Sequence, residues 1–540
     1  MCVTAPLAFS KAEPKPGFDF RHWSSMPMQS GGRLKPLSSF AREVILFVTG
    51  KAHLSGWENT EILLSWMAYP EAWSQEPLFR ISHPDTRKQL MLAADATRFS
   101  VQTLLSNTTV VQYLQSQGSQ SPAPDDKRLP AREQDLKRLL HAIGLFDGVL
   151  RGSALALIPE KGTAPWRSVT PTASDQDPAA TAIREHFFKT VKAYFDSDPV
   201  AFENESRELK SSIESRVDGY GEKEARSISL EDFFNHLRPF QWAWLLLVVS
   251  ALLWALSLLF SQTKGMAWFK KGAIVATIAG VSFQIVGFAL RVLISGRPPV
   301  TNMYESVLWV GFGVLVFTAA VFYFHRERVV LAVGTAVAAV ILFVADLSPA
   351  VLDPTIQPLV PVLRDNFWLT IHVLTITISY AAFALSLGFG NVALFQFFRK
   401  NTLPLKNATA LNQLSYRSMQ FGVVLLAAGT ILGGVWADYS WGRFWGWDPK
   451  ETWALIALLC YLAVLHARFV GWVGTFAFAA LSVGCFLSVM MAWYGVNFVL
   501  GAGLHSYGFS TGGTPWVAGF CALELVWIAA ARIRWKAVHS

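Results

Sequence analysis

Apolar residues are distributed differently in the two parts of the chain. From residue 237 onward they form long runs, and a helix needs roughly 20 such residues to cross a bilayer. Nine runs are long enough: 239–260, 272–294, 306–325, 329–346, 367–398, 418–438, 451–469, 473–500 and 514–533. The fourth run is short, and the fifth and eighth are long enough to tilt or to project from the membrane. This pattern predicts a mainly α, polytopic membrane region over 237–540.

Residues 1–236 contain no run long enough to span a membrane. Helical periodicity dominates instead, with five examples: 39–49, 86–117, 132–157, 181–196 and 201–216. Two segments rich in Pro, Ser, Asp and Thr, 117–131 and 161–180, are expected to be loops or disordered linkers. Residues 31–43 predict an extended lead into a helix capped by Ser38 or Ser39. We therefore expect a helix-rich soluble domain over 1–236.

The charge follows the same division. The 540 residues are 52% hydrophobic and 16% charged, with a net charge of +8. Residues 1–236 hold 27 Lys and Arg against 29 Asp and Glu, whereas 237–540 hold 19 against 9. The second part has too few charges for the surface of a soluble domain, and its basic residues stand between apolar runs. This composition excludes a plain soluble enzyme and indicates no nucleic-acid partner.

The basic residues also predict an orientation. Thirteen lie at one set of helix ends: Lys264, Lys270, Lys271, Arg326, Arg328, Arg399, Lys400, Lys406, Arg417, Arg468, Arg532, Arg534 and Lys536. The opposite loops hold four: Arg297, Arg364, Arg443 and Lys450. The richer side should be cytoplasmic. This predicts an inner (cytoplasmic) membrane protein with its C-terminus inside and residues 1–236 outside, in the extracytoplasmic or periplasmic space.

The region Met1–Lys35 shows neither a signal peptide nor a span that would explain the export of this domain. Either the first span draws the tail across, or translation starts upstream, or the orientation is reversed. The distribution of basic residues disfavours reversal. The four cysteines, Cys2, Cys460, Cys485 and Cys521, contain no CxxC pair. They therefore predict no disulfide framework, zinc site or covalently attached haem.

Four tryptophans lie within the twelve residues 436–447, in a loop predicted over 436–453 outside the membrane. An interfacial aromatic belt is one explanation. The small residues Gly442 and Gly446 between the rings instead favour a flat apolar ligand. Asp448 precedes Pro449 and stands three residues before Glu451, so helix capping is its expected role even if the loop binds a ligand.

This stretch resembles a known family. The sequence Trp441-Gly-Arg-Phe-Trp445-Gly-Trp447-Asp448-Pro-Lys450-Glu451-Thr-Trp453 resembles the WWD signature of haem-handling proteins. It is most similar to the CcsA/ResC type of System II cytochrome c synthase, because CcmC and CcmF proteins differ after the Asp. The resemblance covers about 280–533. More weakly, Gly31–Glu43 resembles part of the periplasmic region of fused CcsB–CcsA chains.

Two histidines are expected on the side of the tryptophans. His372 lies five residues into the fifth span, roughly 8 Å deep, and His505 follows the eighth span. Two imidazoles hold haem iron in six-coordinate form. Taken separately, His372 is also explained as a buried structural histidine and His505 as an ordinary loop residue. The resemblance implies that both are external ligands of haem b.

His466 lies fifteen residues from Glu451, about 22 Å along the helix, so it cannot share that iron. An interfacial, snorkelling histidine is the alternative explanation. The resemblance implies that His466 binds haem within the membrane, with the second ligand coming from a ResB/CcsB-like partner. His325 is a weaker rival for that second position. The external arginines Arg297, Arg364 and Arg443 suit either haem propionates or lipid headgroups.

The implied function is cytochrome c biogenesis. The chain would move haem across the membrane and present it for thioether attachment to the CxxCH motif of apocytochrome c, as part of a holocytochrome c synthase. The expected site comprises His372, His505 and His466 as metal ligands, with Trp441, Trp445, Trp447, Asp448, Arg443 and Arg297 around the haem. Partners would be the ResB/CcsB-like protein, apocytochrome c, haem and membrane lipid. No general acid or base is evident. A haem carrier without lyase activity, as CcmC-like proteins suggest, and an unrelated transporter remain alternatives.

Overall fold

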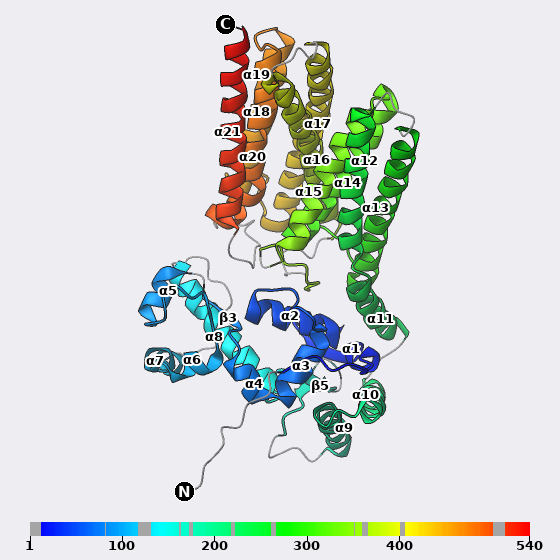
Figure 1. Ribbon diagram of the computed structural model, residues 1–540, viewed down its shortest axis with the longest axis vertical. Helices are drawn as coiled ribbons and strands as arrows, with labels where there is room; N and C mark the ends of the chain where they lie inside the picture. Colours follow the sequence, from blue (N-terminus) through cyan, green and yellow to red (C-terminus); the bar gives the residue numbers. More distant parts are fainter. Residues whose placement is uncertain are drawn as a thin grey trace. The chain divides into compact units, whose positions relative to one another are not determined.

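The computed structural model describes residues 12–81, 83–116, 131–160, 162, 164–171, 177–217, 222–260, 266–349, 351–358, 366–399, 405–500 and 513–539. Contacts within the chain divide it into two compact units, both drawn in Figure 1. Unit 1 runs from Met1 to Leu237 and also includes Thr355–Pro358. Unit 2 comprises Arg238–Pro354 and Leu359–Ser540.

Unit 1 is built mainly from short helices. They are α1 (Arg21–Ser24), α2 (Leu37–Thr49), α3 (Asn59–Ala68), α4 (Pro70–Gln75), α5 (Pro84–Gln89), α6 (Val101–Ser106), α7 (Thr108–Ser116), α8 (Ala131–Leu150), α9 (Pro178–Phe195), α10 (Pro199–Glu214) and α11 (Glu222–Leu237). Three antiparallel strand pairs accompany them: β1 (Pro27–Ser30) with β2 (Arg33–Pro36), β3 (Phe79–Arg80) with β4 (Arg98–Phe99), and β5 (Ala156–Ile158) with β6 (Arg167–Ser168).

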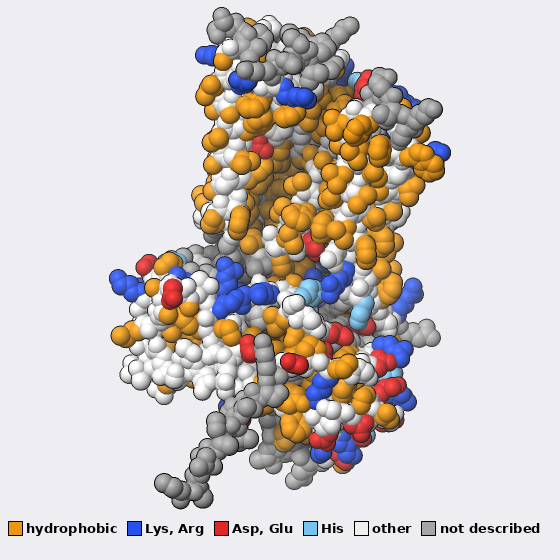
Figure 2. Space-filling model, viewed as in Figure 1, with side chains coloured by type: hydrophobic (Ala, Val, Ile, Leu, Met, Phe, Trp, Pro, Cys, Tyr) orange, Lys and Arg blue, Asp and Glu red, His pale blue; other side chains and the backbone are white. Residues whose placement is uncertain are grey.

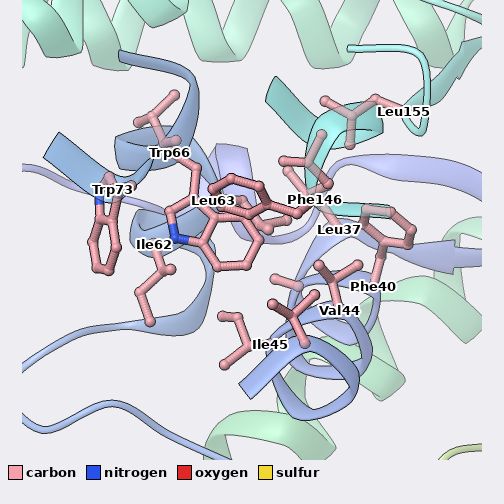
Figure 3. Packing of buried hydrophobic residues seen from close by; sticks show 14 of the residues in the cluster. Leu37, Phe40, Val44, Ile45, Ile62, Leu63, Trp66, Trp73, Phe146 and Leu155 are labelled. Atoms are coloured by element: carbon pink, nitrogen blue, oxygen red, sulfur yellow. The ribbon is translucent and has the colours of Figure 1, made fainter. Parts of the chain in front are cut away.

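Aromatic side chains fill the core of unit 1 (Figure 3). Trp66 of α3 is fully buried and meets Phe146 of α8 edge-to-face, with ring centroids 4.8 Å apart. The apolar positions Leu37, Phe40 and Val44 recur at helical spacing along α2 and turn into the same core. Burial of such large side chains is the main stabilising term for a helix-rich unit with little sheet.

Two of the predicted helices are wrong in their extent. The predicted helix 86–117 is broken, because β3 and β4 pair and draw residues 98–99 into a strand between α5 and α6. The predicted helix 132–157 ends at Leu150, and Gly152 then turns the chain with a φ of +76° that favours glycine. Of the predicted linkers, 117–131 lies outside the described residues apart from its last residue. The described part of 161–180 contains β6 and the start of α9.

The predicted helix cap at Ser38 or Ser39 is also wrong. Helix α2 begins at Leu37 with Pro36 at the N-cap position and no side-chain cap, so both serines lie in the first turn. The Ser38 hydroxyl donates to Asp232 at 2.7 Å, and the Ser39 hydroxyl donates to Glu231 at 2.6 Å. These serines therefore connect α2 to α11 instead of capping their own helix.

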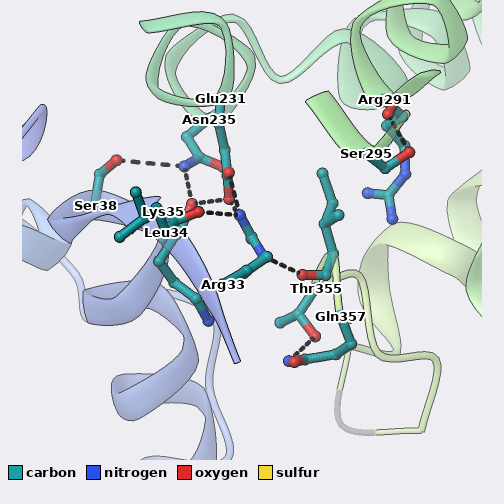
Figure 4. A network of polar contacts seen from close by, with 12 residues as sticks. Arg33, Leu34, Lys35, Ser38, Glu231, Asn235, Arg291, Ser295, Thr355 and Gln357 are labelled. Atoms are coloured by element: carbon teal, nitrogen blue, oxygen red, sulfur yellow. Dashed lines mark hydrogen bonds and ion pairs between the residues drawn. The ribbon is translucent and has the colours of Figure 1, made fainter. Parts of the chain in front are cut away.

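The same carboxylate joins three segments of unit 1 (Figure 4). Glu231 accepts two hydrogen bonds from the Arg33 guanidinium, at 2.6 and 2.7 Å, and both side chains are largely buried. Nε of Arg33 donates to the carbonyl oxygen of Ile356 at 2.7 Å. A planar guanidinium can make such contacts in two directions at once. Arg33 thus connects β2, α11 and the segment Thr355–Pro358.

Unit 2 is a bundle of long apolar helices. They are α12 (Pro239–Leu259), α13 (Met266–Ser295), α14 (Met303–His325), α15 (Arg328–Leu347), α16 (Asn366–Phe398), α17 (Leu405–Trp441), α18 (Pro449–Phe469), α19 (Thr475–Gly484), α20 (Phe486–Met490), the π-helix η2 (Met491–Leu500) and α21 (Thr514–His539). The described residues contain nine helices long and apolar enough to cross a membrane. Figure 2 shows hydrophobic side chains covering the visible face of this bundle. The predicted fold class, a mainly α polytopic membrane protein, is confirmed.

The eighth predicted span, 473–500, is not one regular helix. It consists of α19, α20 and the ten-residue π-helix η2. π-Helical turns are rare, but those that occur are often found at functional sites. They displace side chains from the positions that a regular α-helix would give them. Trp493 of η2 is turned inward and donates from its indole nitrogen to the Ser306 hydroxyl of α14 at 3.2 Å.

Candidate functional site

A cavity of about 180 Å³ opens among one set of helix ends in unit 2. It is formed by the start of α14, the first half of α16, the end of α17, the start of α18, and η2. Its walls are predominantly apolar, as is usual for sites that take a flat organic ligand. Three of its aromatic lining residues, Trp436, Trp445 and Trp493, come from three different segments of the chain.

His372 of α16 lies in the wall of this cavity. Its Nδ1 is 2.8 Å from the carbonyl oxygen of Gly429 on α17, so Nδ1 carries the proton and donates it. In that tautomer the lone pair is on Nε2. The ring also stacks on Trp436, with centroids 6.2 Å apart and planes 13° apart. Metal-binding histidines usually have one nitrogen fixed in this way by a carbonyl or a carboxylate.

Small residues on α17 make this placement possible. A Cβ atom at Gly433 would lie 2.5 Å from Cε1 of His372, closer than real contacts allow. A Cβ at Gly429 would lie 3.0 Å from Ile376 of α16. These two glycines were not among the predicted site residues. The available signal was the spacing Gly429-x-x-x-Gly433 in an apolar run, which is typical of closely packed membrane helices.

The tryptophans do not form one continuous platform. Residues 436–441 belong to helix α17 and residues 449–453 to helix α18, so the predicted loop 436–453 is wrong at both ends and only 442–448 lies between the two helices. Trp436 contacts Trp441 with ring centroids 5.0 Å apart. Trp445 lines the cavity and is perpendicular to Trp447, which is 70% exposed. Of the predicted tryptophans Trp441, Trp445 and Trp447, only Trp445 is among the described residues that line the cavity. Trp436, which was not predicted as a site residue, lines it as well.

The glycines of this segment have structural explanations that differ from the predicted one. A Cβ at Gly446 would lie 0.8 Å from Nη1 of Arg443, so this glycine accommodates the Arg443 guanidinium. Gly442 follows the last residue of α17 with a φ of +69°, where a Cβ would meet nothing within 4 Å. It therefore supplies the left-handed end of that helix. Arg443 and the nearly buried Arg297 are not among the described residues that line the cavity.

The predicted capping role of Asp448 is confirmed. Its carboxylate accepts from the backbone nitrogen of Lys450 at 3.0 Å, and a capping box starts α18. In return the Glu451 carboxylate accepts from the backbone nitrogens of Asp448, at 3.2 Å, and Gly446, at 2.8 Å. Between these two donors, Trp447 has a φ of +57°, which is unusual for a bulky residue. Glu451 therefore holds the turn that carries Trp445 and Trp447, and both Lys450 and Glu451 line the cavity.

The remaining histidines lie elsewhere or outside the described residues. His466 is exposed in the last turn of α18, and its Nδ1 is 2.7 Å from the carbonyl oxygen of Leu462. It lies fifteen residues from Glu451, about 22 Å along the helix. His505 and Arg364 lie outside the described residues. His325 is exposed at the end of α14.

A buried ion pair beside the cavity was missed. Arg291 of α13 and Glu305 of α14 lie 2.7 Å apart, with side chains 1% and 2% exposed. Glu305 also accepts from the backbone nitrogen and hydroxyl of Thr301, both at 2.8 Å, and Thr301 lines the cavity. An arginine inside an apolar run was the sequence signal, since such residues are normally paired.

Comparisons with known proteins agree with this architecture. A family model described as cytochrome C assembly protein matches residues 300–505. The cytochrome c biogenesis protein CcsA of Guillardia theta is 32% identical over 304 residues, which cover 52% of this chain and 97% of that protein. CcsA of Prochlorococcus marinus (strain NATL2A) is 35% identical over 293 residues, covering 48% of this chain and 91% of the relative.

A longer relative matches both units. Protein NrfI of Wolinella succinogenes is 30% identical over 543 residues, which cover 94% of this chain. The chain spans 58% of the length of NrfI. The resemblance predicted from the tryptophan segment is confirmed by these matches. The extent and identity of these matches show that the chain belongs to the CcsA family of cytochrome c biogenesis proteins.

Proposed function

We propose that this protein acts in cytochrome c biogenesis by moving haem b across the cytoplasmic membrane and presenting it to apocytochrome c. Membership of the CcsA family supports the role in cytochrome c maturation. The observation that carries the haem proposal is the placement of His372. Its imidazole lies in the wall of an apolar cavity and is oriented by the Gly429 carbonyl, as expected of an iron ligand.

In this proposal Nε2 of His372 binds the iron, and His505, outside the described residues, supplies the second imidazole. Trp436 supports the ligand by stacking on the His372 imidazole, and Trp445 of the cavity wall packs against the porphyrin. Lys450 in the cavity wall offers a cation for the propionates. Arg443 and Arg297, in two different predicted outer loops, are further candidates. Trp441 and Trp447 support the walls by ring contacts with Trp436 and Trp445.

Covalent attachment of haem to apocytochrome c depends mainly on how the two molecules are oriented, and less on acid–base catalysis. The CxxCH histidine of apocytochrome c displaces one axial imidazole. Each cysteine thiol adds across a vinyl group, so that sulfur bonds to one vinyl carbon and a hydrogen goes to the other. This addition changes no net oxidation state. The contribution of the protein is to hold both reactants in register, for which well-oriented groups gain effective molarities of about 10⁵ M or more.

His466 serves an earlier step of the same pathway. It lies at the far end of α18 from the cavity and is exposed in an apolar helix, where a histidine is costly unless it is used. Haem would be received there on the cytoplasmic side, with the second axial ligand from a ResB/CcsB-like membrane protein. The basic helix ends support an orientation with the tryptophan segment and unit 1 outside and the C-terminus inside.

Replacement of the proposed ligand tests the haem proposal directly. Protein purified from membranes should show the absorption of six-coordinate haem, and His372→Ala should lose most of the signal of the external haem. The matched control is His236→Ala, which removes an exposed histidine from the end of α11 in unit 1. Added imidazole should restore the spectrum of the His372→Ala protein. Haem content and spectra that are the same in both variants would contradict the assignment.

Lyase activity is tested separately. Co-expression of this chain with a ResB/CcsB-like partner and an apocytochrome bearing CxxCH should yield covalently bound haem on a denaturing gel. If haem copurifies with the chain but no holocytochrome forms, the protein is a carrier that delivers haem to a separate lyase. A colourless protein would contradict haem transport by this chain.

A further inference from the structure

An apolar groove of about 420 Å³ lies between α16 and α21, separate from the cavity described above. Val392 and Phe395 of α16 form one wall, and Leu523 and Trp527 of α21 form the other. Phe395 is 49% exposed and Leu523 is 67% exposed, so the groove opens sideways from the bundle. In a membrane this opening faces the hydrocarbon region of the bilayer.

A carboxylate lies at the base of this groove. Glu524 is 7% exposed and stands ten residues into α21, about 15 Å from its start. Among helices α12 to α21 as described, it is the one acidic residue more than three residues from a helix end. Acidic side chains at such depth are costly and normally face a partner.

The described part of the chain satisfies this carboxylate incompletely. Asn391 of α16, which also lines the groove, donates from Nδ2 to Oε1 of Glu524 at 3.3 Å. Within the described residues no second hydrogen bond reaches Glu524. Acyl chains of lipid can fill apolar walls but carry no donor, so a lipid would leave the carboxyl group with an unmet hydrogen bond. The groove therefore calls for an occupant with an apolar body and a hydrogen-bond donor.

Helix α21 has room for such an occupant. Its most apolar stretch is 11% buried, against 28% to 61% for the other eight candidate spans. Its main packing partners within the described residues are α16 and α19. Association of helices in a membrane depends on close packing and on hydrogen bonds between polar side chains, both of which this groove offers.

We propose that the groove between α16 and α21 is the docking surface for a transmembrane helix of a separate protein, which presents a hydrogen-bond-donating side chain to Glu524. The apolar walls pack against that helix, and its donor completes the hydrogen bonding of the carboxyl group. Neither contact involves the tryptophan-lined cavity. The docking surface is therefore independent of whether that cavity holds haem.

Crosslinking in native membranes tests this surface. A photocrosslinking amino acid replaces Leu523 in the full-length chain, and crosslinked peptides are sequenced by mass spectrometry. The expected product is an apolar segment of another protein, about 20 residues long, with a donor side chain such as Lys, Arg, Ser or Asn. The same crosslinker at Ile278 of α13, which is 62% exposed, is the matched control and should not give this product.

Reciprocal substitutions then test the hydrogen bond. Glu524→Leu should lower the crosslink yield about fivefold to tenfold, the effect of one interhelical hydrogen bond in a membrane, whereas Glu524→Gln should retain most of the yield. Replacing the donor of the partner by Leu should give the same loss, and the double change should add little. Equal amounts of each variant in the membrane confirm folding.

Several outcomes would overturn the proposal. They are adducts with lipid or another small molecule only, adducts with a second copy of this chain, and a yield that Glu524→Leu leaves unchanged. Haem content is measured on the same membranes. A colourless protein with an intact, Glu524-dependent crosslink would contradict the haem proposal while supporting the docking surface.

Discussion

The position of His372 is set by single residues on the neighbouring helix. Gly429 supplies the carbonyl that fixes its tautomer, and Gly433 supplies the space for its ring. Neither glycine contributes a side chain to the cavity. The position of the proposed ligand therefore requires the His372 imidazole and also requires glycines on α17, because an alanine methyl group there would collide with α16.

Gly433→Ala should displace the His372 ring, because the added Cβ would lie 2.5 Å from Cε1. Haem affinity, measured by titration of the Soret absorption, should fall about tenfold to a hundredfold, as for other changes around a metal ligand. Gly484→Ala in α19 is the matched control, because its Cβ would meet nothing within 4 Å. Equal affinities for the two variants would refute this role of Gly433.

Glu61 makes the stability of unit 1 dependent on pH. Burial raises the pKa of this carboxyl, although the Lys15 backbone nitrogen and the Tyr194 hydroxyl both donate to it. An acid whose pKa is higher in the folded state binds its proton more tightly when folded. The stabilisation is therefore greatest at low pH and is lost as pH rises from the unfolded pKa of about 4.3 through the raised folded value.

Hydrogen exchange of the full-length protein between pH 4 and pH 8 measures this effect. After correction for the intrinsic rates, protection of α3 and α9 should fall with rising pH in the wild type. In Glu61→Gln this dependence should be largely removed, because the amide does not titrate. The control is Glu71→Gln in α4, for which the pH dependence should match the wild type. A Glu61→Gln profile parallel to the wild type would disprove the link.

At the scale of elements, the turn before α18 depends on one carboxylate. Glu451 accepts both backbone donors that flank Trp447, and this turn carries Trp445 into the cavity wall. Glu451→Ala should weaken haem binding and destabilise the start of α18 by about 1 kcal/mol, as for lost caps elsewhere. Glu451→Gln keeps an acceptor and should retain most of the binding.

The neighbouring substitution Thr452→Ala controls for general effects at this helix start. Haem titration and hydrogen exchange of the first turn of α18 provide the measurements. Similar losses in Glu451→Ala and Glu451→Gln would show that charge, and not the support of the turn, determines the effect. Similar losses in Thr452→Ala would point to a nonspecific effect on the helix.

Elements were predictable where a single pattern determined them. The membrane helices follow from uninterrupted apolar length, and the start of α18 follows from Asp448, Pro449 and Glu451. Prediction was wrong where long-range pairing overrode the local pattern, as in β4, which interrupts the predicted helix 86–117. The π-helix η2 was missed because its residues have the same apolar character as an α-helix.

The site was predictable to a similar extent. His372 could be selected from its depth and from the resemblance, but its contact with Gly429 joins residues 57 positions apart. The pairing of Arg291 with Glu305 likewise depends on how two helices and their connecting loop fold together. Such contacts follow from tertiary packing, which no periodicity in a single sequence encodes.

For the whole molecule, the distribution of basic residues predicts topology. In a background without the four native cysteines, Phe444→Cys should react with a membrane-impermeant maleimide in intact cells, because Phe444 is 48% exposed in the proposed outer segment. His325→Cys, at the proposed inner end of α14, should react only after the membrane is opened. The reverse labelling pattern would show that the orientation is inverted.

The composition of unit 1 has a consequence for the order of biosynthesis. Its last piece, Thr355–Pro358, follows α12 to α15 in the chain, and it receives the hydrogen bond from Arg33 to Ile356. A ribosome therefore synthesises four membrane helices between α11 and this piece. Unit 1 cannot complete its native contacts when residue 237 emerges. Its maturation must wait until those helices have been made, so membrane insertion and the folding of unit 1 are coupled in time.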